Sequence, residues 1–406
     1  MKAANTPNDV FSAIDPSLGY LYQIRYSLYR LLEANEEEEI SIEWVDDVAV
    51  ENDGSINEQL QLKHHLRGKA SLTDSSPDLW KTIRVWSEGV KTGSINPSTT
   101  RLLLITTAAA PAGSIASLLK DTQTGRDAKT ALQRLMDVAS TSGNVALKDS
   151  FDAFKSLPST KKRLLVDSII VVDNMPMITD LEKGIKKKLD LSVRKEHMDL
   201  FYERLEGWWF DKIIRHFIEP NKTSIKRFEL QSKIRDIAEQ FEEDALPIDF
   251  LDAEPPETPD AANDDRLFVV QLRIIALNNK LIEKAIRDYY KAFEQRSRWA
   301  REHLIDDKDL EVYENRLVDE WQRFFYSAVE TEGDKVVNEA EYLKTGREIF
   351  RWMNTIAQFP IRPKVVEPYV MRGSYHMLAD QFPPRVGWHP RFLDRLQDVL
   401  PLQKEQ

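Results

Sequence analysis

The chain has 406 residues, of which 42% are hydrophobic, and its formal net charge is −11. This composition supports two or three globular domains and excludes an intrinsically disordered protein. The absence of cysteine excludes disulfides, thiolate zinc sites and cysteine catalysis. Because the sequence also lacks a signal-peptide pattern and any run approaching the ~20 apolar residues of a membrane span, we expect a cytoplasmic protein without membrane contact.

The first predicted element is a helix from Ser17 to Ala34. Apolar residues at helical spacing give it one buried stripe, formed by Leu21, Ile24, Leu28 and Leu31. Near its start, the segment GYLYQ (19–23) ends in Gln23, which lies on the flank of that stripe.

Two strands follow, the first from Ile40 to Val48 and the second ending at Lys63, with turn residues at positions 52–54 between them. Because a strand alternates its side chains between two faces, Glu43 and Asp47 share one face of the first strand. On the second strand, the polar face carries Gln59, Gln61 and Lys63, and the apolar face carries Leu60 and Leu62. Pairing the strands places a carboxylate, an amide oxygen and an ammonium group together, which outlines a site for a metal ion and a phosphate.

A helix from Pro77 to Val90 and a short buried strand from Arg101 to Thr107 come next. The pattern is largely helical from Asp127 onward, including residues 191–217. The pair Trp208–Trp209 falls in a helical apolar pattern, so we assign it to the core and not to base stacking. The predicted fold is therefore a mixed α/β core, with a sheet flanked by helices, followed by mostly helical regions.

An acidic, proline-rich segment from Glu242 to Asp265 indicates a domain boundary. We therefore divide the chain into an N-terminal domain at 1–220, a linker at 221–265 and a helical C-terminal domain at 266–406. Within the last domain, helices are predicted from Arg266 to Gln295 and from Leu310 to Ala328, and residues 352–388 are predicted to be irregular.

Asp47 followed by Gln61-Leu62-Lys63 on the next strand resembles the PD-(D/E)xK nuclease fold, in the variant where Gln replaces the second acid, as in Mrr-type restriction enzymes. The segment 19–23, the Asp46–Asp47 pair and His64 add to this pattern. Together they resemble the double-stranded-DNA endonuclease domain of bacterial antiphage systems. That domain is found fused to SAVED sensor domains and as the nuclease subunit of Lamassu-type three-component systems. The resemblance covers roughly the first 215 residues.

The resemblance implies a role for each residue of the motif. Asp47 would be the principal ligand of Mg²⁺ or Mn²⁺, and Gln61 would offer its carbonyl oxygen as a second, neutral ligand. Lys63 would orient the attacking water or stabilise the oxyanion of the transition state. Glu43 or Asp46 would add an acidic contact. Gln23 would hold the phosphate or the water shell of the metal.

Each of these residues also has a purely structural explanation. Asp46 and Asp47 can simply end a strand, because Asp is common beside turns. Lys63 can be a solvated lysine that protects a sheet edge. His64 and His65 are expected to be strand-end residues, since adjacent side chains on a strand face opposite sides and cannot chelate one ion.

The net charge opposes autonomous DNA binding, because nucleic-acid-binding proteins usually carry a basic surface. Local basic runs lie within the N-terminal domain, at 161–163 and at 183–188. We assign Lys161 and Lys162 to substrate binding, although such runs are usually solvated faces. Weak intrinsic DNA binding, with delivery by a partner, reconciles the charge with the site.

Residues 292–299, 313–317 and 387–390 resemble, more faintly, the C-terminal domains of three-component effectors. This resemblance implies docking on an SMC-like ABC ATPase subunit, together with a small accessory subunit. No glycine-rich phosphate loop occurs, so the chain is not expected to be the ATPase itself. Ser374 and His376 lack the glycine elbow and the third member of a hydrolase triad and are expected to be structural.

The predicted function is that of a DNA endonuclease effector of antiphage defence, silent on its ATPase partner and active as a homo-oligomer, since a double-strand break needs two active sites. Two alternatives stay open. One is a catalytically inactive nuclease-fold subunit that binds DNA or serves as a scaffold. The other is a purely helical adaptor, which would have no strand at residues 40–48.

Overall fold

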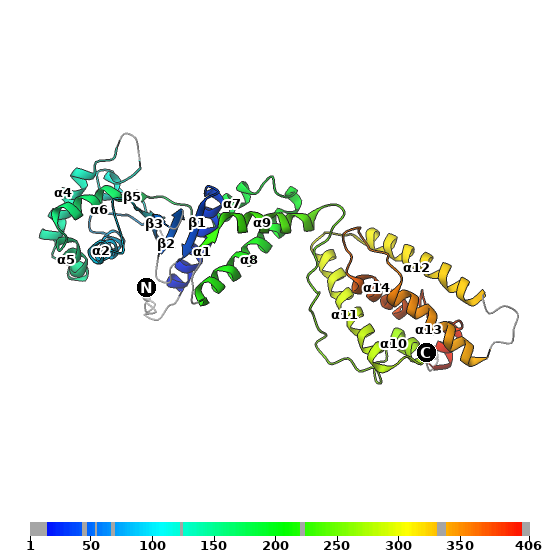
Figure 1. The fold of residues 1–406 in the computed structure, drawn as a ribbon. Helices are drawn as coiled ribbons and strands as arrows, with labels where there is room; N and C mark the ends of the chain where they lie inside the picture. The colour runs from blue at the N-terminus through cyan, green and yellow to red at the C-terminus, as the bar shows by residue number, and fades with distance from the viewer. Residues whose placement is uncertain are drawn as a thin grey trace, which may run out of the picture. The chain divides into compact units, whose positions relative to one another are not determined.

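The computed structural model describes residues 14–42, 47–52, 55–65, 70–121, 125–219, 224–330 and 338–399. The chain divides into two compact units, Met1–Ala238 and Glu239–Gln406 (Figure 1). The first unit contains a mixed sheet flanked by helices, and the described part of the second is helical, as the sequence predicts. Among the described residues, no helix combines the length and apolarity needed to span a bilayer.

The unit boundary differs from the predicted linker at 221–265. Helix α9 (Arg227–Ala238) belongs to the first unit, and the residues from Glu239 onward belong to the second. The proline-rich segment is held there by hydrogen bonds, because Gln295 Nε2 and Trp299 Nε1 donate to the Pro247 carbonyl at 3.1 and 2.7 Å. A proline-rich composition signals the lack of helix or strand, and such a segment can still pack against a helix.

The sheet of the first unit has the strand order β5-β4-β3-β2-β1-β6. Its strands are β1 (Glu38–Ile42), β2 (Asp47–Asn52), β3 (Ser55–Lys63), β4 (Arg101–Thr106), β5 (Ile169–Val172) and β6 (Ile225–Lys226). Strands β1, β2 and β3 pair antiparallel, as do β1 and β6, whereas β3, β4 and β5 pair parallel. Strand β3 is therefore the junction between the two halves of a mixed sheet.

The predicted strand from Ile40 to Val48 is instead two strands. Strands β1 and β2 pair antiparallel, with Ile42 opposite Val48. Two of the predicted acids, Glu43 and Asp46, lie outside the described residues. The alternation of apolar and polar residues runs from β1 into β2 along the sequence, so periodicity alone does not reveal where one strand ends and the next begins.

Helices cover both faces of the sheet (Figure 1). One group comprises α2 (Pro77–Thr92), α3 (Ile115–Leu118), α4 (Ala128–Thr141), α5 (Lys148–Lys155) and α6 (Ser159–Ser168). The other group comprises α1 (Ile14–Glu33), α7 (Ile178–Lys188), α8 (Met198–Ile218) and α9. Leu102 and Leu104 of β4, with Ile169 and Val171 of β5, join the core of the α2 group. Helix α2 begins at Pro77 after Ser76 and ends at Gly93 in the left-handed conformation.

The assignment of Trp209 to the core is confirmed. Its side chain is fully buried, and its Nε1 donates to the Ile24 carbonyl of α1 at 2.9 Å. The neighbouring Phe210 is 41% exposed. Trp209 therefore connects α8 to α1, the helix that carries Gln23.

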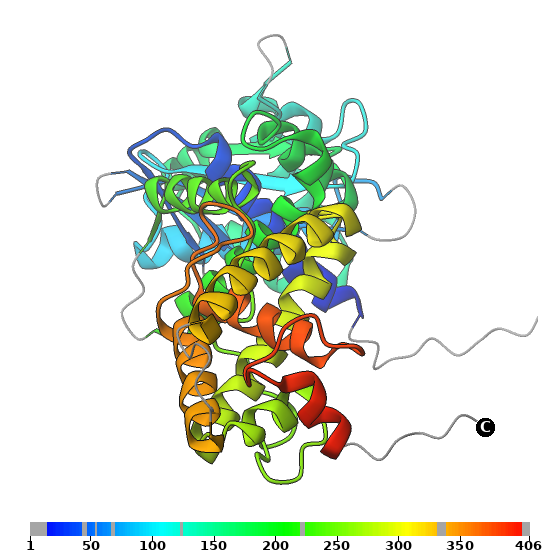
Figure 2. The same ribbon diagram turned by 90° about the vertical axis from the view of Figure 1, so that its right-hand side faces the viewer.

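The described helices of the second unit surround one hydrophobic core (Figure 2). They are α10 (Leu267–Ile274), α11 (Asn279–Arg301), α12 (Asp307–Glu330), α13 (Glu339–Thr355), α14 (Pro368–Asp380) and α15 (Phe392–Val399). The single helix predicted from Arg266 to Gln295 is divided into α10 and α11. The break lies at Ala276, whose φ is +50°, and α11 restarts where the Asn278 side chain accepts a hydrogen bond from Leu281 N at 3.0 Å.

The helix predicted from Leu310 to Ala328 is confirmed as α12, which buries a stripe of apolar residues at helical spacing, namely Tyr313, Leu317, Trp321 and Phe325. The prediction of irregular structure across residues 352–388 is wrong in part. Pro368 opens α14 and does not interrupt it, and Ser374 and His376 lie fully buried on this helix. Both residues are thus core side chains of the second unit.

We expect Gly373→Ala to destabilise the second unit by about 1–3 kcal/mol. Helices α11 and α14 approach closely at this position, and an added Cβ would overlap the Asp288 carbonyl and the Ala292 Cβ. The matched control is Gly207→Ala on α8, where an added Cβ meets open space and the first unit should gain up to about 1 kcal/mol. Denaturant unfolding followed separately for each unit checks both signs. Equal effects of the two substitutions would contradict the close helix contact.

A second prediction concerns pH. Burial lowers the pKa of His376 to about 3, with Arg372 and Arg266 adding to the shift. The unfolded chain, with a pKa of about 6.5 for this group, binds the proton more readily, so acidification from pH 6.5 toward 3 favours unfolding. Relative to wild type, His376→Phe should therefore gain about 2 kcal/mol between pH 6.5 and 5.

Asp288 acts in the opposite sense, because burial raises the pKa of its carboxyl to about 6. Its folded form binds the proton more readily than its unfolded form, so its contribution to stability is lost as the pH rises from about 4 to 6. The measurement is urea unfolding of wild type and of His376→Phe across this range, where the Asp288 contribution is common to both. Parallel stability curves would show that His376 does not titrate as described.

Candidate active site

Strands β2 and β3 bring the two predicted metal ligands to opposite register positions. Asp47 pairs with Gln61, and the next pair along is Val48 with Leu60. In an antiparallel sheet, directly opposite positions are those from which side chains reach the same face. The pairing therefore allows one ion or phosphate to be contacted from both strands.

Strand β3 presents different side chains to the two helical layers. Its parallel pairing with β4 aligns Gln61 with Leu104 and Lys63 with Thr106, which places Gln61 and Lys63 on the face covered by α2. Leu60 and Leu62 occupy the face toward α1. Gln61 is only 2% exposed, so its amide is as buried as the apolar residues beside it. Because helices cover both faces of the sheet, a ligand can reach its residues mainly at the ends of the strands.

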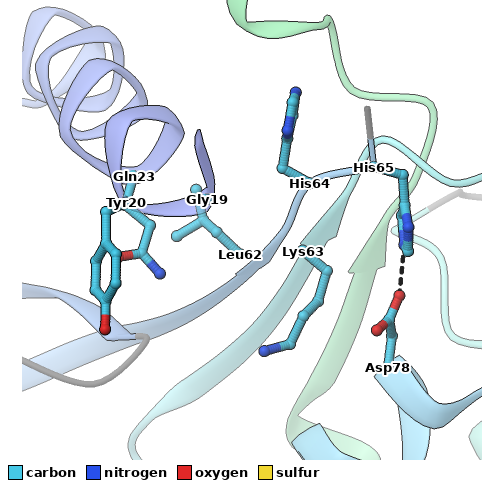
Figure 3. A pocket seen from close by; sticks show the side chains of 8 residues that line it. All are labelled: Gly19, Tyr20, Gln23, Leu62, Lys63, His64, His65 and Asp78. Carbon is cyan, nitrogen blue, oxygen red and sulfur yellow. Dashed lines mark hydrogen bonds and ion pairs between the residues drawn. The ribbon is translucent and has the colours of Figure 1, made fainter. Parts of the chain in front are cut away.

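A pocket of about 240 Å³ opens at the carboxyl end of β3. Its lining residues are Gly19, Tyr20, Gln23, Leu62, Lys63, His64, His65 and Asp78 (Figure 3). Figure 3 shows Tyr20 and Gln23 of α1 on one side, His65 and Asp78 on the other, and Lys63 between them. The structure thus brings Gln23 and Lys63, two of the residues predicted from sequence, to one pocket.

His65 and Asp78 form a pair that the sequence did not reveal. His65 Nε2 lies 2.6 Å from Asp78 Oδ2, and the His65 backbone N–H donates to Thr107 Oγ1 at 2.9 Å. Asp78 occupies the first turn of α2, where an acidic residue is expected simply because it complements the helix dipole. Because the helix dipole alone explains an acidic residue here, the sequence offers no reason to predict a functional role for Asp78.

His64 faces the opposite way and contacts α1. Its ring stacks on Tyr22 with 4.5 Å between the ring centroids. Burial, assisted by the neighbouring His65, lowers the pKa of His64, so this ring is neutral at pH 7. Burial also raises the pKa of Tyr22. His64 therefore belongs to the packing between α1 and β3.

The lysines predicted to bind substrate lie far from this pocket. Lys161 Nζ donates to the Val90 carbonyl at 3.0 Å, near the end of α2, whereas Asp78 is at the beginning of that helix. Twelve helical residues separate Val90 from Asp78, which corresponds to ~18 Å along the helix axis. Lys162 lies over the Phe154 ring of α5. The structure does not bring Lys161 or Lys162 to the pocket.

The basic run on α7 is largely neutralised by carboxylates. Lys183 pairs with Asp180 at 2.8 Å, and Lys188 pairs with Glu33 at 2.9 Å. Lys186 contacts two acids, Glu182 at 2.7 Å and Asp199 at 2.8 Å. These lysines form a solvated, ion-paired face.

Mg²⁺ is commonly held by one or two protein oxygens together with water and substrate phosphate. Gln61 carries an amide oxygen of this kind, and the side chain of Asp47 lies outside the described part of the structure. Within the described ranges, no three His, Asp or Glu side chains gather into a metal-binding group. Glu43 and Asp46, the other two predicted acids, fall outside those ranges.

The second unit supplies the comparison that bears on function. Residues 268–396 match the family described as C-terminal domain 7 of the ABC-three component (ABC-3C) systems. The match supports a component of an ABC-3C defence system. The matched region extends from α10 into α15 and includes the break between α10 and α11. None of the curated proteins matches the chain.

Solved structures give weaker similarities. The Cap4 SAVED/CARF-domain containing receptor of Moraxella osloensis is 16% identical, with a TM-score of 0.33 over 65% of this chain and 61% of that receptor. The Acinetobacter baumannii Cap4 receptor with the cyclic trinucleotide 3'3'3'-cAAA is 13% identical, with a TM-score of 0.33 over 64% of this chain and 57% of that receptor. The chain thus spans about three-fifths of the length of these receptors. Similarity at this level supports no conclusion on fold or function.

Proposed function

We propose that this chain is a metal-dependent DNA endonuclease subunit of an ABC-3C antiphage system. The observation that carries the proposal is the register of β2 and β3, which sets Asp47 opposite Gln61, with Lys63 two residues further along at the mouth of a pocket. The order of α1, β1–β3, α2 and β4 is compatible with the nuclease core that the sequence resembles. Net charge and the ion-paired α7 lysines favour delivery to DNA by a partner.

The residues of the site divide the work of phosphodiester hydrolysis. Asp47 and Gln61 would hold Mg²⁺ or Mn²⁺, which when bound supplies positive charge to neutralise the scissile phosphate. Lys63 contributes an ammonium group at the pocket, where it orients the attacking water or stabilises the charge that develops on the phosphate. Gln23 of α1, on the side of the pocket away from His65, would bind a non-bridging phosphate oxygen or a water molecule beside it.

The second unit provides the connection to the rest of the system. Its match to an ABC-3C C-terminal domain favours docking on an SMC-like ABC ATPase, together with a small accessory subunit. An uncontrolled nuclease would destroy the host genome, so the docked chain is held monomeric and silent. Release or rearrangement would let two nuclease units associate and cut both strands of double-stranded DNA.

The test is to incubate the purified chain with plasmid DNA and Mg²⁺ or Mn²⁺, alone and with its ATPase and accessory subunits, while measuring the mass of each assembly. Cleavage should rise with association of the nuclease units. A strict monomer that cuts as fast as any assembly would refute the control mechanism. An absence of cleavage in every assembly would refute the nuclease activity.

A catalytically inactive nuclease-fold subunit is the second candidate. The buried, neutral Gln61 favours it, because an amide is a weaker metal ligand than the acid it replaces. This alternative predicts that the chain binds DNA or its partners and that Lys63→Ala changes neither. A gel-shift assay run beside the cleavage assay separates the two functions.

A third prediction concerns the metal. DNA cleavage should require Mg²⁺ or Mn²⁺ and cease in EDTA, because the donor set consists of oxygens alone. Gln61→Glu should lower the Mg²⁺ concentration needed for half-maximal cleavage, since a second carboxylate adds charge to the site. The matched control is Gln59→Glu, two residues earlier on the same strand face. Cleavage that persists after exhaustive chelation would rule out this site.

A further inference from the structure

The His65–Asp78 pair forms one wall of the pocket and has no role in the mechanism above. Both side chains retain access to solvent, with exposed fractions of 35% for His65 and 23% for Asp78. Lys63 and His65 are alternate residues of one strand end, so they lie on the same side, about 6.6 Å apart along the chain. That spacing is suited to flanking a single phosphate.

The surroundings of His65 fix the orientation of its ring. Asp78 accepts a hydrogen bond from Nε2, and the backbone of His65 is tied to Thr107. With Nε2–H engaged, the nitrogen left to exchange a proton with a ligand is Nδ1.

We propose that His65 is the general acid of the reaction, with Asp78 as its positioning residue; this inference rests on the proposed nuclease function. The water oxygen forms a bond to phosphorus while the bond from phosphorus to the departing sugar oxygen breaks. The electron pair of that bond passes to the sugar oxygen, which takes the proton from His65 Nδ1. The proton lost by the water passes to solvent, and His65 is protonated again from solvent.

Other groups around the pocket are less suited to this role. The titratable groups that line it with His65 are Lys63 of β3, His64 directly after that strand, Asp78 of α2 and Tyr20 of α1. His64 is stacked on Tyr22, and burial lowers its pKa. Near pH 7 its ring therefore lacks the second proton that an imidazolium would donate. Lys63 already has a role in the proposed mechanism, in which it orients the attacking water or stabilises the charge on the phosphate. His65 is the remaining imidazole, and it is paired with Asp78.

The experiment compares two substrates, ordinary duplex DNA and a duplex in which sulfur replaces the departing sugar oxygen. The full chain, assembled with its partner subunits, cuts each substrate in the presence of Mn²⁺. A thiolate leaves without protonation, so a general acid is needed only for the oxygen substrate. His65→Ala and His65→Gln should lose about 100-fold on the oxygen substrate and retain most of the wild-type rate on the sulfur substrate. Lys63→Ala should be impaired on both.

Asp78→Ala releases the His65 ring and should therefore slow cleavage of the oxygen substrate alone, whereas Asp78→Asn keeps a hydrogen-bond acceptor for Nε2 and should retain most of that rate. Each cleavage rate is divided by the concentration of folded protein. That concentration is taken from the fraction of each variant that shows the wild-type unfolding transition. Equal losses on the two substrates for both His65 variants would overturn the general-acid role while leaving the nuclease function intact. A wild-type assembly that cuts neither substrate would refute the nuclease function, and this inference with it.

Discussion

Lys63→Ala should reduce DNA cleavage by about 10²–10³-fold, the usual loss when one donor that stabilises a transition-state oxyanion is removed. Lys63 ends β3 at the pocket, where it is only partly buried and belongs to no hydrophobic core, so its truncation opens no core cavity. Asp47→Ala should cause a comparable loss, because we propose Asp47 as the principal metal ligand. Initial rates of plasmid nicking in the complete assembly measure both.

The matched control is Lys183→Ala, which removes a lysine of the same unit whose side chain is 79% exposed and paired on the surface with Asp180. This variant should cut at the wild-type rate and unfold at the wild-type temperature. If Lys63→Ala also cuts at nearly the wild-type rate, the assignment of the active site is wrong.

Trp209→Ala should destabilise the first unit by about 3–5 kcal/mol, the range for deleting a large aromatic side chain from a core. The indole is fully buried between α8 and α1, and its N–H donates to the Ile24 carbonyl. Removing it leaves a cavity beside the helix that carries Gln23, while the Ile24 carbonyl keeps its hydrogen bond from Ser27 Oγ at 2.7 Å. Urea denaturation followed by far-ultraviolet circular dichroism measures the loss.

Phe210→Ala is the control for this substitution, because it deletes an aromatic ring from the adjacent, 41% exposed position. Its cost should stay below about 1 kcal/mol. Trp209→Phe should fall between the two, since it keeps most of the apolar surface and loses the hydrogen bond. Similar losses for Trp209→Ala and Phe210→Ala would show that Trp209 does not hold α1 in place.

The parts of the fold that follow from local pattern could be predicted. Helix α2 has proline at its start and glycine at its end, and α12 carries apolar residues at helical spacing throughout. The division of residues 40–48 between β1 and β2 could not, because alternation looks the same on either side of a connection. Strand β5 is a short apolar run between helices, which periodicity cannot distinguish from a buried helical turn.

Some features of the candidate site could likewise be predicted from the sequence, and others could not. Alternation along β3 gives the shared face of Gln61 and Lys63 without any knowledge of tertiary structure. The contact between His65 and Asp78 depends on where the connection after β3 returns the first turn of α2, and sequence periodicity carries no information about that return. For the same reason, the sequence could not show that Lys161 and Lys162 lie away from the pocket.

The ion pairs of α7 have a consequence for how the chain responds to salt. DNA binding gains free energy when cationic side chains displace the counterions condensed on the duplex. A lysine already neutralised by Asp180, Glu182 or Glu33 displaces few of them unless its own pair first breaks. The intrinsic affinity of the chain for DNA should therefore vary little with ionic strength, and a steep salt dependence in the assembled complex would originate in the cationic groups of another subunit.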